Sequence, residues 1–147
     1  MATYTTTALA ALSTTDFAAL TTADAAALGT AQIAILTTAQ VAAFETVDLA
    51  VVGSAAIQTF TTEQLLALNT VQVAALTSKQ IQALTTDQVV ALATDSIVAL
   101  GTAQAASLTT AQAAAMATSQ LAALEAADLA AVSTASVRAI STDQLAA

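Results

Sequence analysis

Large apolar residues recur along the chain at spacings that alternate between three and five residues. From Thr5 to Ala147 the sequence divides without insertion or deletion into eight-residue units such as TTAQVAAF and TTDQVVAL. We call these units octads and number their positions as columns one to eight. Column eight is a large apolar residue in all 17 complete octads, and column five is one in 15 of 18, the exceptions being Ala25, Ala105 and Ala113. We therefore predict that columns five and eight form the core.

The remaining columns predict short helices. Column four is Gln ten times and Asp four times, column two is Thr in 15 octads, and columns six and seven are mainly Ala. Ala and Gln favour helix, and core positions three apart share one helix face. In one interpretation the Thr of column two is the N-cap of a helix of about six residues, such as AQVAAL. In the other, exemplified by TTAQ (Thr37 to Gln40), column one is the N-cap of a capping box with Gln at its third position. The sequence leaves both cap positions open.

Column one also predicts how each helix ends. All three glycines of the protein, Gly29, Gly53 and Gly101, and its only asparagine, Asn69, fall in this column. Gly and Asn tolerate the left-handed backbone conformation better than other residues. We therefore expect a turn with left-handed backbone at column one of the octads.

Helices this short are unstable alone, so stacking must stabilise them. We predict an all-α solenoid, with residues 1–4 as an N-terminal lead-in and residues 5–147 as one continuous array of octads. Two alternatives stay open. One uninterrupted helix would rotate the core columns by about 80° per octad, so that they spiral around the rod. A β-solenoid would need alternation of period two, which the spacing of three and five does not show.

Composition and charge exclude several classes of partner. The net charge is −8, and Lys79 and Arg138 are the only basic residues, so the chain cannot neutralise a nucleic acid backbone. No apolar run approaches the ~18 residues of a membrane span. The chain has no Cys for disulfides and no His, the usual acid/base group and metal ligand. The N-terminus MATYTTTALAAL lacks the basic region of a secretory signal peptide.

Carboxylates are the first candidates for chemistry. Four of them share column four (Asp16, Asp24, Asp48 and Asp128) and four share column three (Glu63, Asp87, Asp95 and Asp143). They could form a calcium site or a catalytic pair, but carboxylates also suit the first turn of a helix, and we favour that interpretation. We expect no catalytic, cofactor-binding or metal-binding residue, no cofactor and no small-molecule substrate.

The Thr and Gln columns are the other candidates. A regular series of Thr is similar to that of helical antifreeze proteins and would make an ice-binding or ligand-binding surface, but capping by the same hydroxyls argues against that role. For the Gln column we favour a cap or a hydrogen-bond ladder between successive coils over a ligand site.

The whole array from Thr5 to Ala147 resembles the Ala/Thr/Gln-rich octapeptide tracts, of the type LTTAQVAA, in very large secreted or surface proteins of bacteria. The resemblance implies a non-enzymatic filament, spacer or adhesin segment outside the cell or on its surface. A designed repeat protein without natural function is the alternative, since such arrays are readily designed. STDQLAA (Ser141 to Ala147) ends without a polar cap, and MATY offers only Tyr4 as a lid. We therefore expect copies to associate end to end and form fibres.

Overall fold

A computed structural model describes residues 4–124 and 126–145, which form 18 helices of four to six residues and no strand. The helices are α1 Thr6–Ala10, α2 Thr14–Ala18, α3 Thr22–Ala26, α4 Thr30–Ile33, α5 Thr38–Ala42, α6 Thr46–Val51, α7 Ser54–Ile57, α8 Thr62–Leu66, α9 Thr70–Ala75, α10 Ser78–Ala83, α11 Thr86–Ala91, α12 Thr94–Val98, α13 Thr102–Ala106, α14 Thr110–Ala115, α15 Thr118–Ala123, α16 Ala126–Ala131, α17 Thr134–Ala139 and α18 Thr142–Leu145. One helix falls in each octad, so the predicted all-α repeat architecture is confirmed and both alternatives are wrong.

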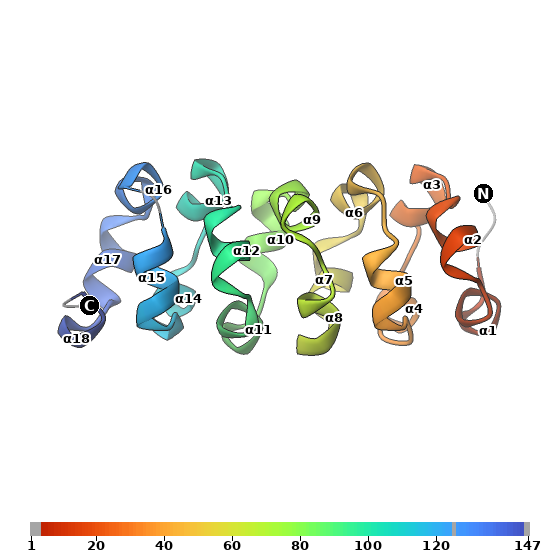
Figure 1. The fold of residues 1–147 in the computed structure, drawn as a ribbon, viewed down its shortest axis with the longest axis horizontal. Coiled ribbons are helices and arrows are strands. Elements are labelled where there is room, and N and C mark those ends of the chain that lie inside the picture. The colour runs from red at the N-terminus through yellow and green to blue at the C-terminus, as the bar shows by residue number, and fades with distance from the viewer. Residues whose placement is uncertain (1–3, 125, 146–147) are drawn as a thin grey trace.

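The helices stack in a regular order. The extensive contacts join each helix to the third one along the chain, for example α3 to α6, α6 to α9 and α9 to α12. Three octads, or 24 residues, therefore make one coil of a solenoid, and the 18 helices make six coils. Figure 1 shows the coils following one another along a single long axis, with the two ends of the chain at opposite ends of the rod. None of the described helices combines the length and apolar character needed to cross a membrane.

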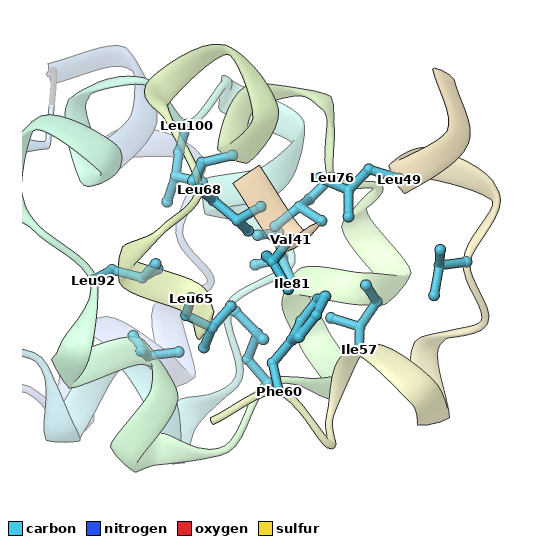
Figure 2. Packing of buried hydrophobic residues seen from close by; sticks show 14 of the residues in the cluster. Val41, Leu49, Ile57, Phe60, Leu65, Leu68, Leu76, Ile81, Leu92 and Leu100 are labelled. Carbon is cyan, nitrogen blue, oxygen red and sulfur yellow. The ribbon is translucent and has the colours of Figure 1, made fainter. Parts of the chain in front are cut away.

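The core lies where columns five and eight predict it. Of the 32 buried hydrophobic residues in the part of the chain that the structure describes, all except Ala56 come from these two columns. Figure 2 shows Ile57, Phe60, Leu65 and Ile81 directed into the interior between the helices. The rings of Phe17 and Phe44 meet edge to face with centroids 4.8 Å apart. Even the small residues of column five are enclosed, since Ala25 and Ala105 are fully buried, so the coils approach closely where alanine replaces a large side chain.

The structure decides between the two cap positions. In α10 the N-cap is Thr77 of column one, whose hydroxyl oxygen accepts a hydrogen bond from the backbone N–H of Gln80. The Thr or Ser of column two, here Ser78, is the first residue of the helix. The interpretation with column two as N-cap is therefore wrong, and the capping box based on column one is right. Column one supplies the cap because its extended backbone turns its side chain back toward the first helical turn.

The expected left-handed turn at column one is also wrong. No described residue has a positive φ, and Gly29 and Asn69 have φ of −92° and −78° with extended ψ. The chain leaves a helix through two extended residues, as at Leu84 (φ −58°, ψ 142°) and Thr85 (φ −71°, ψ 162°). Gly and Asn occur in column one because both are accepted at an N-cap, where Asn69 Oδ1 receives the N–H of Gln72.

Both ends of the array lie partly outside the described residues. Of the lead-in, the structure describes Tyr4, which is half-buried against the core. The expectation of an uncovered end at Ala146 and Ala147 falls outside the described residues. At the last described coil, Leu129 of column five is 37% exposed, whereas column five is buried throughout the preceding octads.

Candidate functional site: the glutamine ladder

The Gln of column four makes hydrogen bonds in two directions at once, and Gln80 in α10 illustrates the arrangement. Its Oε1 accepts the backbone N–H of Thr77 at 2.7 Å and so completes the capping box of its own helix. Its Nε2 donates to the backbone carbonyls of Leu49 at 2.9 Å and Val52 at 2.8 Å, 31 and 28 residues earlier. Both columns of the core therefore contribute a carbonyl to the same amide group.

The same pattern repeats along the solenoid. Nε2 reaches a carbonyl 28 residues earlier from Gln40, Gln64, Gln72, Gln80, Gln88, Gln104, Gln112, Gln120 and Gln144, and Gln32 reaches the carbonyl of Tyr4 in the same way. We call this series the glutamine ladder. Each Gln extends from the start of one helix to the end of the fourth helix before it, which lies in the preceding coil. The prediction of a cap or a ladder between coils is confirmed, and one side chain does both.

The ladder satisfies a carbonyl that the backbone leaves free. Column eight lies in the extended connection between helices, and within the described residues no backbone N–H bonds to a column-eight carbonyl. A buried carbonyl without a partner is costly, so a donor must come from elsewhere in the chain. The Gln amide supplies it in a site that excludes water: Gln72, Gln80 and Gln112 are each only 2% exposed. The buried amides therefore bind neighbouring coils of their own chain.

The ladder is interrupted in five octads. Column four is Asp48 in α6, Ala56 in α7, Ser96 in α12, Asp128 in α16 and Ser136 in α17. All five side chains are buried. Of these, only Ser136 makes a bond of the ladder type, a long one of 3.4 Å from its hydroxyl to the carbonyl of Leu108.

The candidate carboxylates are spread over separate helices. Asp16 and Asp24 bond to the N-caps of their own helices, as in the 2.6 Å bond from the Thr21 hydroxyl to Asp24 Oδ2. In column three, Glu63 lies exposed on α8, and hydrogen bonds from its own backbone N–H and from Thr61 lower the pKa of its carboxyl below the ordinary value of 4.5. Among the described residues no three of His, Cys, Asp and Glu come together in a way that could hold a metal ion. The arrangement is the one expected for charges that stabilise helix N-termini.

Two surface features complete the candidates. The Thr side chains of column two are mostly exposed, as at Thr30, Thr70 and Thr102, and where the structure describes an N-cap residue it belongs to column one. A surface hollow of about 490 Å³ lies between the starts of α6 and α9. Val47 (58% exposed) and Val71 (66% exposed) line it together with polar residues such as Glu45 and Asn69, so its wall is of mixed character.

The comparisons with known proteins assign the repeat. The family model of the ALTTAQ repeat matches residues 9–46, 41–78, 62–94 and 121–147, which together exceed half of the chain. The chain belongs to the ALTTAQ repeat family. The six letters of ALTTAQ correspond to columns seven, eight, one, two, three and four, and so cover the end of one helix, the connection and the next start up to the ladder Gln. The comparison with curated proteins gave no match, and neither did the comparison with solved structures.

Proposed function

We propose that this ALTTAQ array is a structural spacer, a rod without catalytic activity that holds apart whatever is attached to its two ends. The observation that carries the proposal is the glutamine ladder. Its buried amides bond one coil to the next, as Gln112 does to the carbonyls of Ile81 and Leu84. The buried polar residues that recur most often among the described residues therefore serve the continuity of the rod.

The stacking gives the rod a defined length. Packed helices lie about 8–10 Å apart, so six coils correspond to a rod of about 50–60 Å. Each added coil of 24 residues would lengthen it by one such step. A spacer of this kind can be extended by duplication without redesigning the core, because every octad presents the same columns to its neighbours.

The proposal can be tested directly, because the chain has no cysteine and two dyes can therefore be attached at introduced cysteines. Thr6→Cys and Thr142→Cys place dyes on exposed residues of the first and last helices. We expect a narrow distribution of dye separations by single-molecule energy transfer, which moves outward by about 8–10 Å when residues 77–100 are duplicated. A Gly/Ser insertion of equal length is the control and should broaden the distribution. A separation that stays the same, or a broad distribution for the natural chain, contradicts the spacer proposal.

We propose that copies of the isolated chain associate end to end. The association is weak, because the residues in column four near the start of the chain cannot continue the glutamine ladder. If a second copy continued the series, its Asp16 and Asp24 would lie in column four opposite the carbonyls of Val132 and Ile140 of the first. An ionised carboxylate has no hydrogen to donate to a carbonyl. Sedimentation velocity and electron microscopy should show monomers at low concentration and end-to-end oligomers as the concentration rises; monomers alone at every concentration would contradict this proposal. An extracellular or surface setting is proposed on the resemblance alone.

A second candidate function has one observation in its favour. Because column one makes the caps, the exposed Thr hydroxyls of column two are available to ordered water, and the argument that capping consumes them no longer holds. Against it, stacked helices separate successive Thr of one row by about 8–10 Å. Thermal hysteresis of the purified chain tests this candidate. Thermal hysteresis that disappears when exposed column-two Thr residues are changed to Ala would support ice binding, and the absence of thermal hysteresis would exclude it.

A further inference from the structure

Two successive helices, α6 and α7, lack the bonds that fix the starts of their neighbours. Column four is Asp48 in α6 and Ala56 in α7, so neither helix has a ladder amide. The N-caps Glu45 and Gly53 make no side-chain cap bond, and neither helix has a capping box. Among the helices whose N-cap residue the structure describes, α12 is the other one without either bond, but both of its chain neighbours have a capping box.

Of the two column-four residues, Asp48 departs further from the ladder than Ala56 does. Its side chain is 4% exposed, and its Oδ1 is buried without any hydrogen-bond partner. By the ladder spacing of 28 and 31 residues, the side chain in this position serves the carbonyls of Leu20 and Phe17. An ionised carboxylate can only accept hydrogen bonds, so it cannot serve them as Gln80 serves Val52 and Leu49. The site therefore combines an unsatisfied acceptor on the side chain with one on the backbone.

Ala56 leaves the next position empty, because it has no polar group to reach the carbonyl of Leu28. The polar tie from α7 to the preceding coil is a long one: the hydroxyl of Thr59 donates to the carbonyl of Thr30 at 3.4 Å. Both helices keep their hydrogen bonds to the following coil, because Gln80 and Gln88 donate to the carbonyls at the ends of α6 and α7. The deficit is therefore confined to the junction of α6–α7 with the coil before it.

We propose that residues 45–60 form a built-in opening point, at which α6 and α7 separate from α3 and α4 while the rest of the solenoid stays closed. The packing of α6 on α3 and of α7 on α4 closes the junction in the ground state. Each missing buried hydrogen bond shifts the opening equilibrium by a factor of about 2 to 10. Two missing ladder positions and two missing caps together favour opening here by at least about tenfold over a junction with an intact ladder.

Hydrogen exchange followed by mass spectrometry of the full chain tests this proposal. We expect the amides of α6 and α7 to exchange at least about tenfold faster than those of α9 and α10, which have complete capping boxes and ladder bonds. Equal or slower exchange in α6 and α7 would overturn the proposal. A bound water joining Asp48 to the carbonyl of Leu20 would give this second result, since it would restore the missing bonds.

Two substitutions at one position separate the missing bond from the buried charge. Asp48→Gln supplies an amide long enough to reach the earlier coil and should slow exchange in α6 by about tenfold. Asp48→Asn removes the charge at the same length and should slow exchange much less. The converse variant, Gln80→Asp, should create a new opening point at the junction of α10 with α6. Equal slowing by Asn and Gln would overturn the proposal, as would unchanged exchange at α10 in Gln80→Asp. These readouts do not depend on the spacer function.

Discussion

Truncation of one ladder glutamine, Gln80→Ala, is the perturbation whose effect can be worked out most completely. The side chain is 2% exposed and makes four hydrogen bonds: from the Thr77 N–H and hydroxyl to Oε1, and from Nε2 to the carbonyls of Leu49 and Val52. The Val52 carbonyl is left without a partner when the amide is removed, because no backbone N–H serves it. The Thr77 N–H loses its partner as well.

The free-energy change follows from these two groups. Leaving a buried donor or acceptor unsatisfied costs about 1–3 kcal/mol, and the Thr77 N–H at the helix start recovers part of its loss by bonding to water. Alanine has a better helix propensity than glutamine, which returns a few tenths of a kcal/mol. We therefore expect the free energy of unfolding to fall by about 2–4 kcal/mol. With a urea m-value of about 2 kcal/mol/M, the unfolding midpoint should fall by roughly 1–2 M.

Two variants of the same helix make the measurement decisive. Gln82→Ala removes a Gln from column six, where the side chain is exposed, and should leave the midpoint nearly unchanged. Gln80→Glu keeps an oxygen for the cap but replaces the donor, and should destabilise at least as much as Gln80→Ala. The assay is urea unfolding followed by circular dichroism at 222 nm. Equal midpoints for Gln80→Ala and Gln82→Ala would refute the reasoning, since the buried amide bonds would then contribute nothing net.

Three further predictions follow from the caps, the charges and the chain ends. Gly101→Thr should raise the free energy of unfolding by about 0.5–1 kcal/mol in the same urea assay. A Cβ at this position meets only Gln104 Oε1, at 3.7 Å, and the added hydroxyl completes the N-cap. Destabilisation would contradict the backbone conformation assigned to residue 101. An NMR titration should place the pKa of Glu63 below 4.5, and Thr61→Ala should raise this pKa. The stability that the Glu63 charge contributes is present above pH 4.5 and is lost as the pH falls through the lowered pKa. An unchanged pKa in Thr61→Ala would contradict the assigned cause. Asp16→Gln combined with Asp24→Gln should increase end-to-end association in sedimentation velocity, and unchanged sedimentation would show that column four does not control stacking.

Much of this fold could be predicted from local pattern. The octad, the core columns and the short helices depend on hydrophobic spacing and helix propensity, both of which are visible in a stretch such as TTDQVVAL. The Gln side chain was also predictable as a cap or a ladder, because a polar residue repeated beside a core column needs a partner.

Two features could not be predicted because they depend on backbone angles and on neighbours distant in sequence. The number of octads per coil follows from the extended dihedral angles at columns eight and one, such as those of Leu84 and Thr85, which no residue preference fixes. The error about Gly29 and Asn69 had the same origin, since both residues suit an N-cap as well as a left-handed turn. The sequence does not show that column one is the N-cap, so it left capping open as a role for the hydroxyls of column two.

The central claim is that side-chain amides in each coil after the first bond to carbonyls of the coil before it, at a fixed separation of 28 residues. The most direct measurement is a nuclear Overhauser spectrum of the isotopically labelled chain, read from the side-chain amide protons of Gln80, Gln88 and Gln112. The account predicts cross-peaks to residues 52, 60 and 84, with slow exchange of these protons with water. Cross-peaks confined to residues within four positions of each Gln, together with rapid exchange, would contradict it.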